Sequence, residues 1–380
     1  MTLNNNEQLI QMIHQQIIQS GGAISFATFM QLALYAPNLG YYNTEKRIFG
    51  RGGDFVTASE ISPLFAACIA RQCQQILTAL GAGDILEIGA GSGVFAKNLL
   101  LELQKINCLP MQYFIYEISP ALRAQQLQLF EQECPELLKH VRWLNQLPQS
   151  GIKGIIFANE VLDALPATCF QVTDEGVEER CVTWEKDHFA WKNKKSTSSD
   201  FVSHMKTISE TGGLSVGYTS EINLEIPKWI NPIAQTLNQG IILLIDYGYG
   251  RREYYHPDRT QGTLMCFQQH QSHSDPLVQV GLQDITAHVD FTAVAESADD
   301  AGLTVAGYTT QAAFLLACGL LELAETSQNA SAADTYHQAQ AIKTLTLPSQ
   351  MGEIIKVIAL TKQIDLSLKG FALHDRRKDL

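Results

Sequence analysis

An apolar, strand-like segment that runs directly into three alternating glycines constrains this chain most. The segment Asp84–Ile88 is followed by Gly89, Gly91 and Gly93, and residues 94–106 then have the pattern of a helix. Glycine lets a backbone approach a ligand closely, because no Cβ atom stands in the way. The sequence therefore predicts an α/β unit in which a strand-to-helix turn borders a ligand site.

The spacing of these glycines narrows the class of ligand. A dinucleotide fingerprint is Gly-x-Gly-x-x-Gly, whereas here the third glycine comes one residue early. A phosphate-binding loop ends in Gly-Lys-Ser or Gly-Lys-Thr, which this turn lacks. Glu87, two residues before the first glycine, disfavours a pyrophosphate and suits a ligand with a cationic amino-acid end. S-adenosylmethionine, with its ammonium and sulfonium, is such a ligand. The alternative is an ordinary tight turn in an α/β domain.

Length and composition limit the class of protein that this chain can be. The 380 residues are 46% hydrophobic and 17% charged, enough for one large core or two modest ones. The net charge of −12 argues against a nonspecific nucleic-acid binder, which needs a basic surface. The eight cysteines show no zinc-like spacing, so we expect free thiols in a reducing compartment.

The amino terminus and the longest apolar runs bear on localisation. The first six residues are polar and resemble neither a secretion signal nor a mitochondrial presequence. No apolar run approaches the roughly 20 residues of a membrane span. We therefore expect a soluble, cytoplasmic protein.

Apolar runs alternate with helical patterns after residue 80. Strands are expected at Ile85–Ile88, Tyr113–Tyr116, Ile155–Ala158 and Ile241–Ile245. Such runs are typical of a mostly parallel sheet covered on both faces, so the predicted fold class is α/β and Rossmann-like. We divide the chain into an N-terminal helical cap with a cofactor-covering loop, 1–80, and a core, 81–380. Within the core, 168–226 is expected to be an inserted segment of antiparallel strands.

Acidic side chains follow two more of the expected strands. Glu117 ends the second strand, where α/β nucleotide folds place an acid that binds the ribose hydroxyls. Alone, it would be interpreted as a solvated acid. The third strand delivers Asn159, Glu160 and Asp163 to its carboxyl end, where ligands bind in open α/β sheets. The alternative for Asn159 and Asp163 is helix capping.

Three other polar segments are weaker candidates for a part in the ligand site. The segment Gly53–Thr57 is interpreted as a loop that closes over the cofactor, although glycine with aspartate is also ordinary turn chemistry. Asp246 follows another apolar strand and is expected to face the same crevice. The polar cluster Asp284–Asp290 contains a single histidine, so we interpret that histidine as structural and predict no metal site.

Motifs along nearly the whole chain resemble those of the MidA-like methyltransferases, a family that includes a mitochondrial complex I assembly factor. The usual family turn is closer to Gly-Pro-Gly-Arg-Gly; here Ala90 and Ser92 replace the intervening residues and the glycines are kept. Besides the turn, the resemblance rests on Phe29-Met30, Gly40-Tyr41-Tyr42, Gly53-Asp54-Phe55, Glu60 with Ser62-Pro63-Leu64-Phe65, Asn159-Glu160, Asp163-Ala164-Leu165-Pro166, Asp246-Tyr247-Gly248, Asp284–Phe291 and Met351-Gly352-Glu353.

The resemblance implies a class I methyltransferase core of seven strands. It also implies S-adenosylmethionine as the donor, S-adenosylhomocysteine as the product and an arginine side chain of a protein as the acceptor. The mitochondrial member acts on a complex I subunit, which makes such a subunit a possible acceptor here. The alternatives are a small-molecule methyltransferase and a donor-binding assembly scaffold without catalysis. The expected partner is a protein substrate, with no nucleic acid and no membrane insertion.

On this hypothesis the site residues fall into two groups. Glu87 and the glycine backbone would hold the methionine end of the donor, and Glu117 would hold the ribose. The expected donor-binding residues are Glu87, Gly89, Gly91, Gly93, Glu117, Asn159, Gly53 and Thr57. A guanidinium acceptor needs a carboxylate clamp to align one nitrogen with the sulfonium. The expected clamp residues are Glu160, Asp163 and Asp54.

Overall fold

The computed structural model describes residues 4–43, 57–209, 213–269, 271–325 and 332–380. The chain forms two compact units, each described here by itself. The first unit comprises Met1–Phe55, Leu162–Lys228 and Tyr249–Thr292, and the second comprises Val56–Val161, Trp229–Gly248 and Ala293–Leu380. The division into 1–80 and 81–380 that the sequence suggests stays a prediction.

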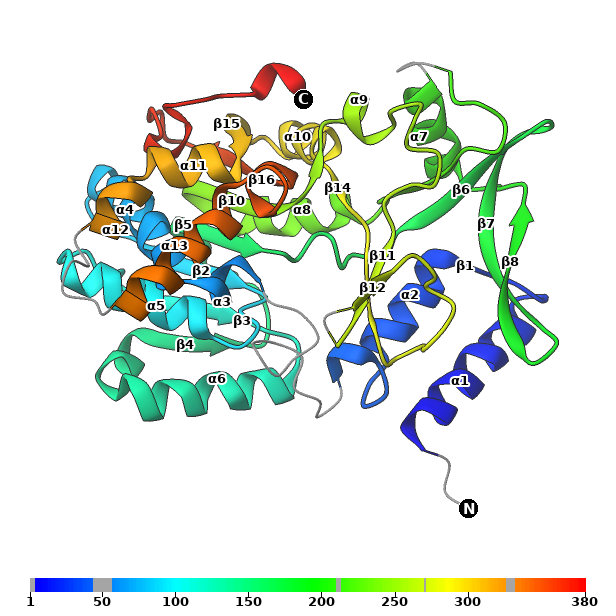
Figure 1. Ribbon diagram of the computed structural model, residues 1–380, viewed down its shortest axis with the longest axis horizontal. Coiled ribbons are helices and arrows are strands. Elements are labelled where there is room, and N and C mark those ends of the chain that lie inside the picture. The colour runs from blue at the N-terminus through cyan, green and yellow to red at the C-terminus, as the bar shows by residue number, and fades with distance from the viewer. Residues whose placement is uncertain (1–3, 44–56, 210–212, 270, 326–331) are drawn as a thin grey trace. The chain divides into compact units, whose positions relative to one another are not determined.

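Among the described residues, the second unit is built on seven strands in the order β15-β16-β10-β5-β2-β3-β4 (Figure 1). The five strands from β10 to β4 are parallel, and β16 runs antiparallel to both of its neighbours. The strands are β2 (Asp84–Ile88), β3 (Tyr113–Tyr116), β4 (Val141–Leu144), β5 (Ile152–Asn159), β10 (Leu237–Tyr249), β15 (Thr304–Thr310) and β16 (Ile355–Lys362). The mostly parallel sheet confirms the predicted fold class.

The order of these strands reverses between β2 and β5. The chain goes from β2 outward to β3 and β4, and then returns to the other side of β2 for β5 and β10. Open α/β sheets bind ligands at such a reversal, beyond the carboxyl ends of the strands. The glycine turn after β2 and the polar residues after β5 therefore lie at the same place in the sheet.

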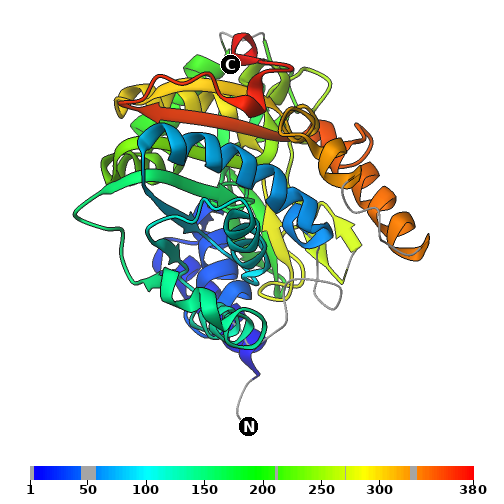
Figure 2. The ribbon, with the colours of Figure 1, turned by 90° about the vertical axis from the view of Figure 1, so that its left-hand side faces the viewer.

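Helices cover the sheet and complete its core. Figure 2 shows α4, in blue, over one face of the sheet, where it shares a hydrophobic core with β2, β5, α5 and α11. Helix α4 begins at Pro63, because Ser62 Oγ accepts the Leu64 N–H at 3.2 Å and proline suits the first helical turn. The helices wholly or mostly in this unit are α3 (Ala58–Ile61), α4 (Pro63–Leu80), α5 (Val94–Lys105), α6 (Pro120–Glu133), α8 (Ile226–Thr236), α10 (Phe291–Asp300), α11 (Gln311–Ala317), α12 (Leu320–Glu325), α13 (Ala332–Thr346) and α14 (Met351–Ile354).

The first unit contains two antiparallel sheets. One has the order β1-β7-β6-β9 with β8 paired to β7, and the other has the order β12-β11-β13 (Figure 1). Their strands are β1 (Ile24–Ser25), β6 (Thr168–Thr173), β7 (Gly176–Glu185), β8 (His188–Lys194), β9 (Thr219–Ile222), β11 (Met265–Gln268), β12 (Gln271–His273) and β13 (Asp284–Thr286). Strand β14 (Val289–Asp290) is also in this unit but belongs to neither of these sheets. The antiparallel strands expected within 168–226 are confirmed, and the amino-terminal β1 extends their sheet.

Helices α1 (Asn5–Gln19) and α2 (Phe26–Tyr35) pack with these sheets in a second hydrophobic core. Leu9, Ile13 and Ile17 of α1 are buried at a spacing of four residues, so they form one apolar face. Helices α7 (Ser199–Ser209) and α9 (Arg251–Tyr254) complete this unit.

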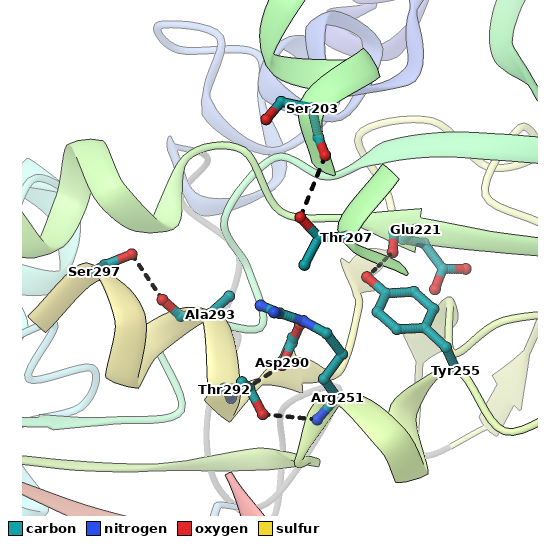
Figure 3. Close-up of polar contacts among 9 residues, drawn as sticks. All are labelled: Ser203, Thr207, Glu221, Arg251, Tyr255, Asp290, Thr292, Ala293 and Ser297. Atoms are coloured by element: carbon teal, nitrogen blue, oxygen red, sulfur yellow. Dashed lines mark hydrogen bonds and ion pairs between the residues drawn. The ribbon is translucent and has the colours of Figure 1, made fainter. Parts of the chain in front are cut away.

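A buried ion pair lies beside α9. Arg251 Nε donates to Asp290 Oδ2 at 3.0 Å, and both side chains are 9% exposed. Thr292 links the same two residues, because its hydroxyl accepts the Arg251 N–H and its N–H donates to the Asp290 carboxylate (Figure 3). Asp290 is therefore engaged in the structure of the first unit.

Candidate active site

The glycine turn after β2 has a conformation that favours glycine at each of its three positions. Gly89, Gly91 and Gly93 have φ angles of +70°, +53° and +82°. A Cβ on Gly89 would lie 2.8 Å from Val161 Cγ2, and one on Gly93 would lie 3.0 Å from Gln126 Cγ. Other residues would be strained at these angles and would crowd their neighbours. The turn therefore packs closely against Val161 and Gln126 at the carboxyl edge of the sheet.

Two buried carboxylates, Glu87 and Glu117, lie at the ends of the neighbouring strands β2 and β3. Glu87 is 3% exposed, and its Oε2 accepts the hydroxyl of Tyr113 at 2.8 Å. Burial, with a smaller effect of the Glu117 charge, raises the pKa of Glu87 to about 8, against the opposing hydrogen bond from Tyr113. Burial also raises the pKa of Glu117, although its Oε1 accepts the Ser119 N–H at 2.9 Å. Both groups would gain from a cationic or hydrogen-bond-donating ligand.

The raised pKa of Glu87 predicts a pH-dependent stability. Above about pH 4.5 the unfolded chain loses this proton, whereas the folded protein keeps it up to a pKa of about 8. The unfolded state then binds fewer protons, so the free energy of unfolding falls as the pH rises through this window. One proton corresponds to ~1.4 kcal/mol per pH unit, so we expect a loss of about 3 kcal/mol between about pH 5.5 and 7.5. Urea unfolding at several pH values measures it.

Two variants control this experiment. Glu87→Gln should have a shallower pH dependence than the wild type, because the titrating group is gone. Glu133→Gln removes a carboxylate whose side chain is 53% exposed and should keep the wild-type slope. If the free energy of unfolding of Glu87→Gln falls with pH as steeply as that of the wild type, the raised pKa of Glu87 is contradicted.

The residues after β5 form a strained turn. Glu160 has a φ angle of +53°, a conformation that costs a non-glycine residue ~1–3 kcal/mol. Hydrogen bonds on both sides hold it there. The Glu160 N–H donates to the Ile245 carbonyl at 2.8 Å, and the Val161 N–H donates to Asp246 Oδ2 at 3.0 Å. Such strain is concentrated at functional sites, so it makes Glu160 a candidate functional residue.

The Glu160 carboxylate connects two segments of the second unit. Its Oε1 accepts the Ala58 N–H and the Asn159 Nδ2 group, each at 3.1 Å. The other polar atom of the Asn159 amide, Oδ1, is buried and has no hydrogen-bond partner among the described residues. A buried acceptor without a donor is costly, and a bound ligand with an N–H group would satisfy it.

The predicted covering segment is described only from Thr57 onward; Gly53 and Asp54 lie outside the described residues. Thr57 is buried, and its hydroxyl is 2.8 Å from that of Ser59. It precedes helix α3, whose Glu60 accepts a hydrogen bond from the Ser92 hydroxyl in the glycine turn. Thr57 therefore belongs to a segment that is tied to the turn.

Asp163 lies in the first unit, whereas Glu160 lies in the second. Asp163 is 8% exposed, and its carbonyl accepts the Ala287 N–H at 2.9 Å. Burial, followed by the charges of Asp284, Tyr35 and Asp163, raises the pKa of Tyr42, whose hydroxyl donates to Asp284 Oδ1 at 2.8 Å. The structure thus groups Asp163 with Tyr42 and Asp284, and its role toward an acceptor stays a prediction.

Three residues that support the donor-side turn were missed by the sequence analysis. Gln126 Nε2 donates to the Gly91 carbonyl at 2.8 Å, while its Oε1 accepts the Trp143 Nε1–H at 2.9 Å. Its signal was available: Gln126 stands in the buried stripe of α6, four residues from Leu122 and Phe130. Tyr113 was recognised only as part of a strand and Glu60 only as part of a family motif, so their contacts with Glu87 and Ser92 were not predicted.

A family model decides the class of protein. Residues 68–309 match the family described as "Putative S-adenosyl-L-methionine-dependent methyltransferase", which is more than half of the chain. The chain belongs to this family. It is an S-adenosylmethionine-dependent methyltransferase, as the MidA-like resemblance implied.

Solved structures agree with this assignment. A candidate methyl transferase from Burkholderia thailandensis, crystallised with S-adenosyl-homocysteine, is 37% identical with a TM-score of 0.93, covering 99% of this chain and 97% of that one. A native structure from the same organism is 36% identical with a TM-score of 0.91 and the same coverage. The predicted donor, S-adenosylmethionine, is confirmed by the family and by the ligand of the first neighbour.

Curated relatives carry more specific names. A Drosophila melanogaster protein named "Protein arginine methyltransferase NDUFAF7 homolog, mitochondrial" is 28% identical over 90% of this chain and 82% of its own. The Danio rerio protein "Protein arginine methyltransferase NDUFAF7, mitochondrial" is 26% identical over 92% of this chain and 85% of its own. The Homo sapiens protein of that name is 27% identical over 72% of this chain.

These names contradict the cytoplasmic localisation expected from the sequence, since the relatives are mitochondrial by name. The expectation relied on the lack of a presequence-like amino terminus, and such a lack does not determine where a protein functions. In the parts of the chain that the structure describes, every helix is too short or too polar to cross a bilayer.

The residues at the edge of the sheet fit the donor. The buried carboxylates Glu87 and Glu117 suit an ammonium and a pair of hydroxyls, and the unpartnered Asn159 Oδ1 suits an N–H. The turn has no side chain at positions 89, 91 and 93, so its backbone can approach a ligand closely. The assignment of each residue to a part of the donor stays a prediction.

Proposed function

We propose that this methyltransferase transfers a methyl group to an arginine side chain of a protein. The observation that carries the proposal is the Glu160 carboxylate, held in a strained turn beside the glycine turn of the donor site. A fixed carboxylate is the group that aligns a guanidinium, because it accepts paired N–H bonds and matches its charge. The names of the curated relatives support the same acceptor.

The proposed mechanism is mainly one of positioning. Bound S-adenosylmethionine supplies a methyl group on a sulfonium. Glu87, Glu117 and Asn159 orient the donor, and Glu160 orients one guanidinium nitrogen toward the methyl group. That nitrogen gains the methyl group as the carbon–sulfur bond breaks and S-adenosylhomocysteine leaves as a neutral thioether. The nitrogen then releases one proton to water, so the methylated guanidinium keeps its single positive charge. A carboxylate beside it stabilises this charge before and after transfer. We propose Asp163 and Asp54 as further members of the clamp.

We further propose, from the family resemblance, that the acceptor is a subunit of respiratory complex I. The acidic chain, with a net charge of −12, suits a basic peptide around the target arginine. It also disfavours nucleic acid as a partner.

The test is transfer of a labelled methyl group from the donor into fractionated cell protein, followed by mass spectrometry of the labelled band. We expect label on arginine in few proteins, and none with the donor-site variant Gly91→Val. Label on a small molecule, or on another side chain, would replace the proposed acceptor. Donor binding without any transfer would favour the assembly scaffold instead.

A further inference from the structure

We infer that the short helix α3 positions the donor-binding turn, and that it does so through Glu60. Helix α3 lies directly before α4 and consists of the four residues Ala58–Ile61. It is attached at its start and near its end, to side chains that follow two different strands.

The first attachment is to the glycine turn itself. Ser92 stands between Gly91 and Gly93, and its hydroxyl donates to Glu60 Oε1. The same oxygen of Ser92 accepts the Val94 N–H at 3.3 Å, in the first turn of α5. The Ser92 hydroxyl therefore joins Glu60 both to the turn and to the helix that follows it.

The second attachment is to the end of β5. The N–H of Ala58, the first residue of α3, donates to Glu160 Oε1 at 3.1 Å. Ala58 is fully buried in the hydrophobic core of the sheet, so this end of the helix is fixed. Helix α3 thus connects the glycine turn, through Glu60, to the strained turn that carries Glu160.

Helix α3 and the glycine turn at residues 89–93 are each unstable in isolation, so both need the contacts that join them. A helix of one turn is not stable alone, and no side chain caps α3 at Thr57. The turn has glycine at three of the five positions 89–93, and glycine loses the most conformational freedom when it is ordered. A contact that holds this turn before the donor arrives lowers the ordering cost of binding. The charge-assisted bond from Ser92 to Glu60 is such a contact.

The test measures donor affinity by calorimetry on the full chain. We expect Glu60→Ala and Ser92→Ala each to raise the Kd for S-adenosylmethionine about tenfold, as for loss of a hydrogen bond to a charged group. Because both remove the same contact, the double variant should be little worse than either one. In steady-state assays the KM for the donor should rise more than kcat falls.

Matched variants separate positioning from general stability. Ser92→Thr keeps a hydroxyl and should keep most of the donor affinity. Glu60→Gln keeps an acceptor but no charge, so its donor Kd should lie between those of the wild type and Glu60→Ala. Gln104→Ala, at an exposed position of α5, should bind the donor as the wild type does. A donor Kd that is unchanged in Glu60→Ala, or effects that add fully in the double variant, would overturn the inference. So would a lowered Tm with unchanged donor affinity. None of these outcomes depends on the acceptor being an arginine.

Discussion

Glu160→Gln is expected to lower kcat on the order of 100-fold while the Kd for the donor stays within about threefold of the wild type. The amide oxygen of glutamine can still accept the Ala58 N–H that Glu160 Oε1 accepts at 3.1 Å. The substitution therefore keeps the attachment of α3 and removes only the charge. If that charge aligns a guanidinium, its loss affects the transfer step and leaves the donor site in place. Calorimetry and single-turnover methyl transfer measure the two quantities separately.

The control for this variant is Glu133→Gln, which removes one partly exposed negative charge at the end of α6, where Glu133 pairs with Lys97. Glu133→Gln should change neither kcat nor the Kd for the donor. If donor binding disappears in Glu160→Gln, then Glu160 belongs to the donor site and the clamp proposal is wrong. A wild-type kcat would exclude a role for the charge altogether.

Gly91→Val is expected to raise the Kd for the donor by at least about 100-fold. At a φ of +53° a valine is strained, and its branched side chain would occupy space in the turn that borders the donor. The carbonyl of Gly91 is also held by Gln126 Nε2 at 2.8 Å, so the turn cannot rotate away without losing that bond. A loss of this size corresponds to ~2.7 kcal/mol of binding free energy. Calorimetric titration with S-adenosylmethionine measures it.

Gly302→Val separates backbone strain from loss of the site. Gly302 has a φ of +75° in the same unit, and apart from its chain neighbours no atom of the described residues lies within 4 Å of the position of its Cβ. Both variants should lose stability to strain, but only Gly91→Val should lose the donor. Donor affinity at the wild-type level in folded Gly91→Val would refute the assignment of the turn to the donor site.

Local patterns predicted those parts of the fold that depend on local physics. The apolar runs at β2, β3, β5 and β10 marked the buried parallel strands, because both of their faces are covered. Strands β4 and β15 were not predicted, since Val141–Leu144 and Thr304–Thr310 are short or partly polar runs that become strands through their neighbours. The cytoplasmic expectation failed because it rested on what the amino terminus lacks.

The sequence by itself predicted the donor correctly, from three glycines at alternate positions after an apolar strand, an acid before them and another at the next strand end. That these residues bind the donor stays a prediction. These signals are local, since each depends on a backbone angle or on the end of one strand. Only the tertiary structure decided the protonation of Glu87, because burial by distant segments raises its pKa. It also decided that Glu160 is strained, that Asp246 holds the next residue in place, and that Glu60 meets Ser92 across more than thirty residues of chain. Such contacts join residues that are distant in sequence, so a local sequence pattern cannot predict them.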